Sequence, residues 1–383
     1  MKLLLFLSFI IIVASQNITY DQDFLEEFDL YFNATQKLYK KLFDDADYKK
    51  DMAPIFGRIN IPVHLLLELS YMRLIEIDSE TQQVSLVLEI INHWSDLRLR
   101  WDPEDYNGVN VLFVNSGILW IPEYSASDSQ EFELLAPDAQ RFARLYNNGT
   151  VYYETTIFMK FSCKLNMWNF PFDVQSCGIG FQTYSLTKQG FNLSTKVSEV
   201  MDPSVLEGNG EWCIISLTNN YTVEVPTLSL AGFQLRLHRE PLFYVFVIVL
   251  PCFLLTTLSN FGMFWSSRVK EDKLGKMSLG LASMMAMTVL LDLASQQIHK
   301  NANFPLLGWY VIICTILISL GCIMVVLISN GCQQVYRKPK PGLLAKLEQY
   351  VFSRAFGAHL LFQGANLTNL IYFLSHWKGH PNS

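Results

Sequence analysis

Apolar and polar positions follow two different patterns along the chain, and the change comes near Pro241. Before that residue, apolar side chains alternate with polar ones in short runs separated by turn-forming Asn, Asp and Gly. The clearest runs are residues 84–90, 109–114, 156–161 and 232–238. Alternation of period two is typical of strands with one buried face, and many short strands at this spacing favour an antiparallel sandwich. We therefore predict a β-sandwich for most of the first part.

A helical period precedes these strands, between Asp21 and about Asp47. Its apolar positions are Leu25, Phe28, Phe32, Leu38, Leu42 and Phe43. Spacings of three, four and seven residues place side chains on one face of a helix. We predict an N-terminal helix ahead of the sandwich.

Four long apolar segments follow Pro241: residues 242–264, 274–298, 306–328 and 351–377. A helix needs about 20 mainly apolar residues to cross a bilayer. The second segment contains one carboxylate, Asp292, and the fourth is interrupted by polar residues, including Arg354 and His359. We predict a bundle of four transmembrane helices, with the fourth the least regular.

The first fifteen residues resemble a secretory signal peptide. Met1-Lys2 precede an apolar run that ends at Val13, and the small residues Ala14-Ser15 follow it. A charged start, a short apolar core and a small-residue cleavage site define such signals, whereas a membrane anchor needs a longer run. Glycosylation sequons begin at Asn17, Asn33, Asn148, Asn192 and Asn220, all before the first span. A sixth at Asn366 lies in an apolar segment, and we regard it as accidental.

Basic residues fix the orientation. Between the first two spans lie Arg268, Lys270, Lys273 and Lys276, and after the third lie Arg337, Lys338, Lys340 and Lys346. Such clusters mark cytoplasmic loops, so both termini are expected outside the cell. The predicted organisation is a signal peptide (1–15), an extracellular domain (16–240), three helices (241–330), a short cytoplasmic segment (331–350), and a fourth helix with tail (351–383).

Composition supports a membrane protein. Half of the residues are hydrophobic, only 17% are charged, and the mean hydropathy is +0.20. The net charge of −6 gives no basic face for nucleic acid. The sequence contains no nucleophile elbow, phosphate loop or metal-spaced His/Cys cluster. We therefore expect no enzymatic activity, cofactor, metal site or nucleic-acid partner.

Three cysteines lie in the exported part: Cys163, Cys177 and Cys213. A disulfide between Cys163 and Cys177 would close a short loop and stabilise the fold by about 3 kcal/mol in an oxidising compartment. Cys213 would then remain unpaired.

The residues inside this loop are distinctive. Cys163 and Cys177 enclose Phe170-Pro171-Phe172-Asp173, which resembles the signature loop of the pentameric Cys-loop receptors. Further matching motifs are Trp94-Ser-Asp-Leu-Arg-Leu-Arg-Trp101, Trp120-Ile-Pro122-Glu123 and Arg239-Glu-Pro241-Leu-Phe-Tyr. The nicotinic acetylcholine receptor branch is the most similar, and the chain resembles a divergent invertebrate member. The resemblance implies a pentamer formed with four further subunits, here most simply identical ones.

The resemblance also implies that the second span lines an ion pore. Its candidate pore residues are Ser278, Ala282, Met285, Val289, Asp292 and Gln296. Spacings of four and three residues place all six on one helical face. A ring of Asp292 carboxylates would attract permeant cations, and rings of Met285 and Val289 could close the pore by dewetting. The alternative is a helix that packs a polar stripe into a bundle without a conduit.

Ion selectivity rests on fewer residues. Anion-conducting relatives carry Pro-Ala-Arg at the inner mouth, where this chain has Leu274-Gly275-Lys276. Cation-conducting relatives carry Glu at the position of Gly275, and nearby Glu271 or Asp272 could replace it. Asp292 favours cations.

The ligand site departs from the nicotinic pattern. Nicotinic receptors bind a quaternary ammonium ion in a box of aromatic side chains where two subunits meet. In this chain Tyr184 stands at the position of the box tryptophan, and Ser127 replaces a box tyrosine. Glu89 replaces the aromatic residue of the complementary face, which the neighbouring subunit contributes. In the loop between Asn219 and Ser229, which would also contribute to the box, Tyr221 is the single aromatic residue. Such a box should bind quaternary ammonium ions weakly, whereas Glu89 favours a cation or a hydrogen-bond donor. The ligand is thus a small molecule of unknown identity, or the cleft is vestigial.

Coupling residues are expected at the membrane junction. Arg239 could pair with Asp78 or Glu80, and residues Phe170, Pro171, Phe172 and Asp173 would press on the link at residues 301–305. Alternatively, Arg239 could anchor the chain to lipid headgroups. The leading hypothesis is a ligand-gated channel of the plasma membrane, and the alternative is a non-conducting or accessory receptor-like protein that keeps the fold.

Overall fold

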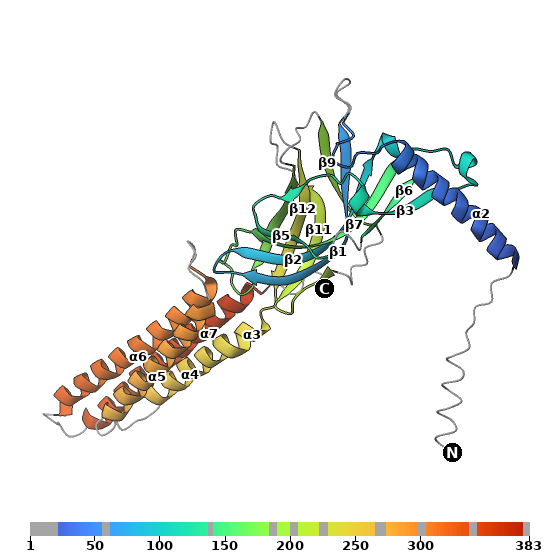
Figure 1. The fold of residues 1–383 in the computed structure, drawn as a ribbon. Coiled ribbons are helices and arrows are strands. Elements are labelled where there is room, and N and C mark those ends of the chain that lie inside the picture. Colours follow the sequence, from blue (N-terminus) through green and yellow to red (C-terminus); the bar gives the residue numbers. More distant parts are fainter. Residues whose placement is uncertain are drawn as a thin grey trace, which may run out of the picture.

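The alternating stretches of the first part form two facing β-sheets, and the apolar segments of the second part form a helical bundle (Figure 1). The computed structural model of the chain describes residues 22–55, 62–136, 141–183, 190–199, 206–221, 229–264, 273–297, 304–336 and 343–377. The predicted signal peptide and Asn17 lie outside these residues.

The larger sheet has the strand order β10-β1-β2-β7-β6-β3, with β5 also paired to β7 and β9 to β1. Its strands are β1 (Val63–Asp78), β2 (Gln83–Ser95), β3 (Val111–Asn115), β5 (Ser129–Leu134), β6 (Phe142–Tyr146), β7 (Thr150–Ser162), β9 (Phe191–Val197) and β10 (Leu206–Glu207). The smaller sheet has the order β11-β12-β8-β4. Its strands are β11 (Trp212–Tyr221), β12 (Leu230–Arg239), β8 (Val174–Gln182) and β4 (Ser125–Ala126). The four runs used for the prediction lie in β2, β3, β7 and β12, so the predicted sandwich is confirmed.

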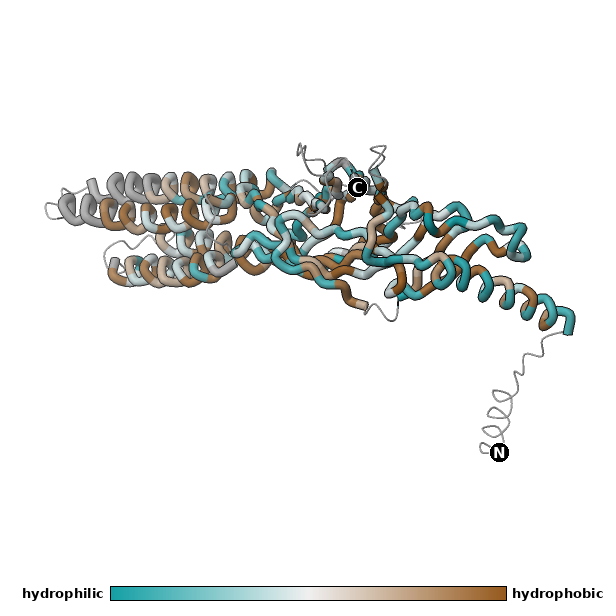
Figure 2. Tube along the Cα trace, turned by 45° about the horizontal axis from the view of Figure 1, so that its top comes forward, coloured by the Kyte–Doolittle hydropathy of each residue, from teal (hydrophilic) through white to brown (hydrophobic). Residues whose placement is uncertain are grey.

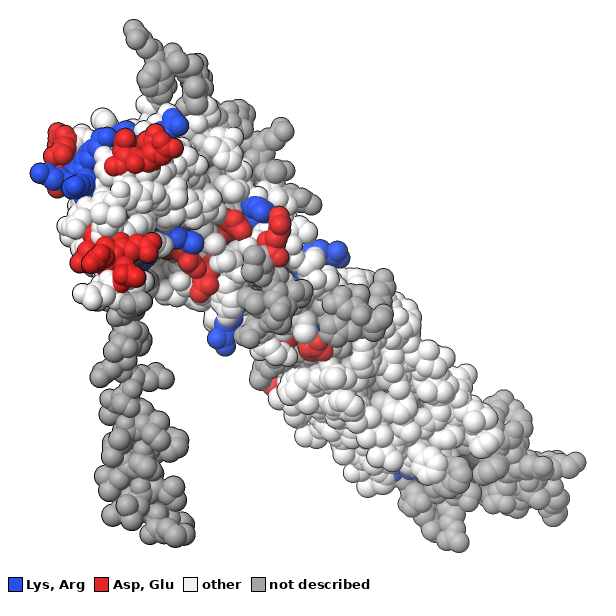
Figure 3. Space-filling view, turned by 90° about the vertical axis from the view of Figure 1, so that its right-hand side faces the viewer, with Lys and Arg blue, Asp and Glu red and all other residues white. Residues whose placement is uncertain are grey.

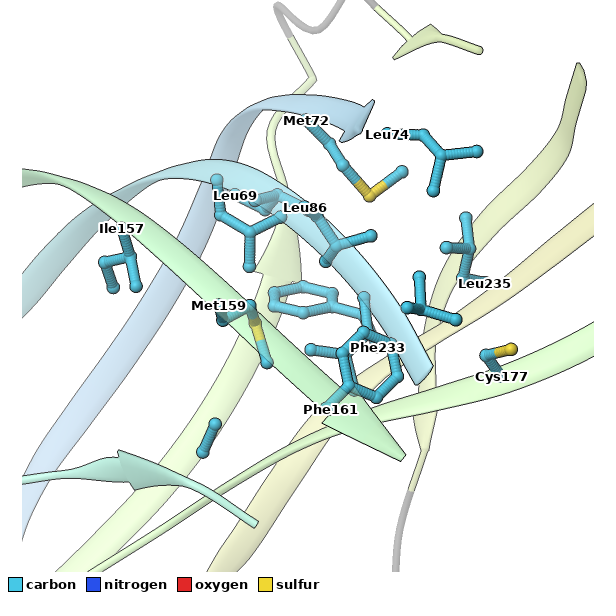
Figure 4. Close-up of a cluster of buried hydrophobic side chains, with 14 of the residues drawn as sticks. Leu69, Met72, Leu74, Leu86, Ile157, Met159, Phe161, Cys177, Phe233 and Leu235 are labelled. Carbon is cyan, nitrogen blue, oxygen red and sulfur yellow. The ribbon is translucent and has the colours of Figure 1, made fainter. Parts of the chain in front are cut away.

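Alternating burial produces the core between the sheets. Along β7, buried and more exposed residues alternate almost without interruption, because successive side chains point to opposite faces of a strand. Figure 4 shows Leu86, Met159 and Phe161 of the larger sheet meeting Phe233 and Leu235 of the smaller one. This packing holds the two sheets face to face.

The predicted N-terminal helix is present as α2 (Gln22–Tyr39), continued by one π-helical turn (Lys40–Asp45). Within this described segment the buried residues are Ala34, Leu38 and Leu42. Only the second half of the helix therefore packs on the sandwich.

A partly buried ion pair fastens the segment after α2 to the sandwich. Arg98 binds both carboxylate oxygens of Asp96, at 2.9 Å through Nε and 2.7 Å through Nη2. Its other nitrogen, Nη1, donates to the carbonyls of Lys49 (3.2 Å) and Met52 (2.8 Å). The Tyr48 hydroxyl donates to Asp96 at 2.9 Å and accepts from the backbone N–H of residue 120 at 3.1 Å. Burial raises the pKa of Tyr48 to about 12, so this hydroxyl stays protonated and keeps its donor role.

The second part consists of α3 (Leu242–Tyr244), a π-helical turn (Val245–Val249), α4 (Leu250–Phe264), α5 (Lys273–Gln297), α6 (Leu306–Tyr336) and α7 (Leu343–Ser375). Among the described residues, three helices are long and apolar enough to cross a membrane: Leu242–Phe264, Leu274–Ser295 and Leu306–Leu327. Figure 2 shows brown, apolar stretches along these helices. The fourth predicted span is helical in α7 but is not among the three.

Polar contacts explain how the less apolar α7 is held. Gln363 donates to the carbonyl of Thr257 at 3.0 Å, and Asn366 donates to the Thr257 hydroxyl at 3.0 Å. One turn further, Asn369 donates to the carbonyl of Tyr310 at 3.3 Å. Asn366 is fully buried, so its sequon is inaccessible to a glycosyltransferase, which agrees with the interpretation that this sequon is accidental. Side-chain amides that bond across helices in this way hold transmembrane helices together.

We predict that Arg98→Met destabilises the extracellular domain by about 3 kcal/mol, because it leaves the fully buried Asp96 carboxylate without its partner. Lys49→Met is the matched control, since the Lys49–Asp47 pair is exposed and should contribute little. Thermal unfolding of the full chain in detergent measures both variants. Equal melting temperatures for the two variants would contradict this account of the Arg98 cluster.

Candidate functional site

The buried guanidinium of Arg239 lies where the sandwich meets the helices. Arg239 ends β12, three residues before α3 begins, and is 2% exposed. Its Nε donates to Asp173 at 2.9 Å, and its Nη1 is paired with Glu211. Its carbon Cζ lies 4.0 Å from the ring centre of Trp212 and 4.8 Å from that of Phe170. Carboxylates and aromatic faces together replace the water that this charge loses.

The expected pairing of Arg239 with Asp78 or Glu80 is wrong. The Asp78 carboxylate instead accepts hydrogen bonds from the backbone of Glu80 at 2.8 Å and from the Thr81 hydroxyl at 2.6 Å. It thus caps the turn between β1 and β2, as an aspartate at a turn commonly does. Glu211, which sequence reasoning missed, takes the place beside Arg239 because β11 and β12 pair with residue 212 opposite residue 239.

The predicted disulfide is confirmed. Cys163 and Cys177 are bonded, with their Cα atoms 5.5 Å apart. Inside the loop, Gln175 donates to Asp173 at 2.7 Å and to the carbonyl of Asn166 at 2.9 Å. The loop is therefore a rigid piece that carries Asp173 to Arg239.

The same loop touches the membrane helices directly. The backbone N–H groups of Leu306 and Leu307, at the start of α6, donate to the carbonyls of Trp168 (2.9 Å) and Phe170 (3.3 Å). These are helix-end donors without partners inside the helix. The ring of Phe172 packs 5.2 Å from that of Phe373 and 5.9 Å from that of Trp377, centre to centre, at the end of α7.

We expected this contact on residues 301–305. Residues 301–303 lie outside the described residues, and the hydrogen bonds found fall on the first turn of α6, directly after the link. The peptide bond between Phe170 and Pro171 is cis. The loop thus connects Arg239, α6 and α7 through its backbone and its aromatic side chains.

Two residues of the expected ligand site, Tyr221 and Ser127, lie close together on the smaller sheet. Tyr221 pairs with Gly232 on β12, and its ring covers Gly178 and Gly180 of β8, so that a side chain at either glycine would collide with it. The Ser127 backbone N–H donates to the carbonyl of Gly180 at 2.8 Å. Tyr184 lies outside the described residues. The structure therefore brings two of the predicted ligand residues together.

A nearby aromatic residue does not replace the missing box member. Tyr124, three residues before Ser127, is turned into the core between Phe132 (6.3 Å between ring centres) and Phe181 (5.9 Å). Burial raises its pKa to about 12. Side chains alternate between the two faces of extended backbone, and the Tyr124 ring points into the core. The number of residues from Trp120 does not reveal this direction.

Glu89 lies on the larger sheet, away from Tyr221 and Ser127. This is expected for a residue that one subunit contributes to the ligand site of its neighbour. It pairs with Tyr71 on β1 and Thr156 on β7. Burial, and then the negative charge of Glu154 on the same face of the sheet, raise the pKa of Glu89. Within one subunit it is therefore separated from Tyr221 by the thickness of the sandwich, and only a second subunit could bring such residues together.

The predicted pore stripe lies on the side of α5 that no other described element covers. Ser278, Ala282, Met285, Val289 and Asp292 are all exposed, with Met285 at 71% and Val289 at 61%. The opposite side packs against the bundle through Gly280, Ser283, Met287 and Ala294. The side chain of Gln296 lies outside the described residues.

Three sequons can be placed on the surface. Asn33 on α2, Asn148 in the turn between β6 and β7, and Asn192 on β9 are exposed. Asn220 is in β11, but its side chain is outside the described part of the chain. Glycosylation at these positions stays a prediction.

Comparisons with known proteins identify relatives along most of the chain. A family model described as the neurotransmitter-gated ion-channel ligand binding domain matches residues 35–241, more than half of the 383 residues. The neuronal acetylcholine receptor subunit beta-4 of Gallus gallus is 26% identical over 340 residues, which is 86% of this chain and 69% of the relative.

Two further relatives are similar to a comparable degree. The acetylcholine receptor subunit delta of Gallus gallus is 26% identical over 79% of this chain and 61% of its own length. The neuronal acetylcholine receptor subunit alpha-2 of Homo sapiens is 27% identical over 77% and 55%. This chain thus spans between 55% and 69% of these relatives. All three are vertebrate proteins, so the expected invertebrate origin stays a prediction.

Cys213 provides a test of the junction. As predicted, it is unpaired, and its thiol donates to Glu240 at 3.1 Å. Burial, and then the hydrogen bond and charge of Glu240, raise its pKa to about 11. At pH 8 only about one thiol in a thousand would be the reactive thiolate.

We predict that Glu240→Gln lowers the pKa of Cys213 and accelerates its alkylation at pH 8, because the negative charge that opposes ionisation is removed. Iodoacetamide labelling across pH, read by peptide mass spectrometry, measures both proteins. A midpoint near pH 8.5 in the unsubstituted protein would show that the Cys213–Glu240 contact does not hold in solution.

Proposed function

This chain belongs to the neurotransmitter-gated ion-channel family, and we propose that it is one subunit of a pentameric ligand-gated channel in the plasma membrane. A small molecule binds between extracellular domains, and the pore along α5 opens in response. The family consists of channels rather than enzymes. Four further copies of this chain complete the ring, and both termini lie outside the cell.

The arrangement of α5 carries this proposal. In a single subunit, the side of α5 that bears Met285, Val289 and Asp292 has no covering element among the described residues. A carboxylate facing lipid is costly, so this side requires water. Five copies around an axis would enclose the stripe in a water-filled pore, with Asp292 at its outer end.

The contacts at the membrane junction support gating by the extracellular domain. Arg239 and the disulfide loop link β12 and β8 to α3, α6 and α7 through the buried contacts described above. Movement of the sandwich would therefore be transmitted to the helices next to α5, which itself packs on α6 and α4.

We propose a cationic ligand other than a quaternary ammonium ion. The relatives are named acetylcholine receptor subunits, but here Ser127 and Glu89 replace two aromatics and Tyr221 rests on a glycine surface. Glu89 and Glu154 make the complementary face acidic. A protonated amine with N–H donors suits a carboxylate better than a choline head group does.

We further propose cation selectivity. Asp292 is exposed on the stripe, and five carboxylates on one ring would concentrate cations at the outer mouth. Gly275 provides no carboxylate at the inner mouth, and Glu271 and Asp272 lie outside the described residues, so the selectivity is assigned to the outer ring.

An accessory role is the second candidate function, favoured by the incomplete aromatic box. Such a subunit would keep the fold and require a partner subunit in order to conduct. Whole-cell currents from cells that express this chain alone distinguish the two, since an accessory subunit gives current only with a partner.

The pore assignment predicts a change of ion selectivity. Asp292→Lys should shift reversal potentials toward anions, and Asp292→Asn should lower cation conductance, because the charge at the outer mouth is reversed or removed. The measurement is whole-cell recording under sodium and chloride gradients. An unchanged reversal potential for Asp292→Lys, at normal surface expression, would remove this residue from the selectivity filter.

The same stripe predicts a closed gate at Met285. Met285→Ser should give a channel that leaks without ligand, because an apolar ring excludes water only while it stays apolar. Met284→Ser is the matched control, since the neighbouring Met284 packs toward the bundle. Equal leak in the two variants would place the gate elsewhere.

The ligand assignment predicts that protonated amines stabilise the purified protein. In a thermal-shift screen of small primary amines, stabilisation should disappear in Glu89→Gln and persist in Glu131→Gln, whose carboxylate is exposed on β5. Stabilisation should also weaken on acidification, at a pH above the usual range of glutamate, because the raised pKa of Glu89 protonates it early. Binding that is unaffected by Glu89→Gln would contradict the proposed ligand class.

A further inference from the structure

Three membrane helices meet at one tightly packed point, formed by Met263 of α4, Gly280 of α5 and Cys322 of α6. The Cys322 thiol lies 3.7 Å from the sulfur of Met263. A Cβ atom added at Gly280 would overlap the Cys322 sulfur and would lie 3.5 Å from that of Met263. All three residues belong to the apolar spans. The backbone of α5 is therefore separated from α6 at this point only by the thiol of Cys322.

Packing, rather than charge, governs this part of the molecule. In Figure 3 the Lys, Arg, Asp and Glu residues gather on the extracellular domain, and the described surface of the helices in this view is almost entirely without them. Within a bilayer, helices associate through close van der Waals contact, and small residues let their backbones approach. The glycine between α5 and α6 thus sets how closely these two helices pack.

The Gly280–Cys322 contact is less able to relax than a neighbouring one. A Cβ atom added at Gly262 of α4 would meet the terminal methyl group of Leu279, which can turn away because it ends a flexible side chain. The Cys322 sulfur is bonded directly to Cβ, so it can move only by changing its χ1 rotamer, and a helix restricts that choice. Relief of an overlap at Gly280 therefore requires a shift of the helices themselves.

Gly280 stands on the side of α5 opposite the pore stripe. At 3.6 residues per turn, it lies about 160° around the helix from both Ser278 and Ala282. Both of these residues are exposed, whereas Gly280 is buried. A group added at Gly280 would therefore push α5 away from α6 in the direction of Ser278 and Ala282.

From this geometry we propose that the Gly280–Cys322 contact sets the width of the pore at the level of Ser278 and Ala282. The inference rests on the proposed pore along α5. Glycine at residue 280 lets α5 seat fully against α6, because the Cys322 sulfur leaves no room for a side chain. In a fivefold ring, each α5 that moves off α6 moves toward the axis. One methyl group added in every subunit therefore narrows the pore from five sides.

Cross-linking between neighbouring subunits measures this width without a ligand. In a Cys213→Ser background, Ala282→Cys should form disulfides between copies on oxidation, giving dimers and higher bands on a non-reducing gel. Adding Gly280→Ala should accelerate the reaction severalfold, because a disulfide forms only between closely spaced residues. Gly364→Ala on α7 is the matched control and should leave the rate unchanged, since an added Cβ there meets no described atom within 4 Å.

Cys322→Ala is the rescue variant. In Gly280→Ala/Cys322→Ala, the Cβ of residue 280 would lie 3.6 Å from the Cβ of residue 322, which is an ordinary contact. The cross-linking rate should therefore return to that of the parent protein. Single-channel conductance should fall in Gly280→Ala and recover in the pair, a change that a general loss of stability does not produce. The pair must reach the cell surface even where Gly280→Ala alone does not.

The outcomes separate this inference from the proposed function. Cross-linking at Ala282→Cys that is equally fast with Gly280→Ala and with Gly364→Ala would overturn the inference and leave the pore in place. An acceleration that Cys322→Ala does not reverse would also overturn it, because residue 280 would then act through another neighbour. The absence of any cross-link between subunits at Ala282→Cys would contradict the pore along α5, and the inference with it.

Discussion

The buried charge of Arg239 is the constraint on which the membrane junction depends. A guanidinium removed from water must be compensated, and removing one partner of such a pair costs about 3–5 kcal/mol. Its carboxylate partners stand directly before β8 and β11, and its aromatic neighbours come from the disulfide loop, β11 and α3. Because the Arg239 guanidinium contacts all of these groups at once, it couples the extracellular domain to the first membrane helix. Asp173 is fully buried, whereas Glu211 remains half exposed, so the two carboxylates are unequal.

The bilayer imposes a second constraint, on polar groups within the helices. Asn366 and Asn369 of α7 satisfy it inside the subunit through bonds to α4 and α6. Asp292 of α5 is instead exposed, on the side of the helix opposite its contacts with the described part of the bundle. The first arrangement holds a helix of modest hydropathy in place, and the second is the basis of the proposed pore. Together they explain why a chain with so many apolar residues still depends on a few polar ones for its architecture.

Much of this could be predicted from the sequence, and the failures have physical reasons. The disulfide loop, the strands and the stripe on α5 depend on spacing within one segment, which periodicity reports directly. The partner of Arg239 depends on the register between β11 and β12, and the sequence offered Asp78 and Glu80 as equally acidic alternatives. The inward direction of Tyr124 likewise depends on packing against Phe132 and Phe181. The burial of α2 at Ala34 and Leu38 alone could not be predicted, because a helical period does not say which half of a helix is buried.

The central claim is that five copies of this chain surround a pore lined by α5, under an extracellular domain that is locked to the helices by Arg239. Cryo-electron microscopy of the purified full chain in lipid nanodiscs tests it most directly. The account predicts a fivefold ring with α5 innermost, the Asp292 side chains facing the axis, and Arg239 between Asp173 and Glu211 in every subunit. A different number of copies, or an α5 that faces lipid, would contradict it.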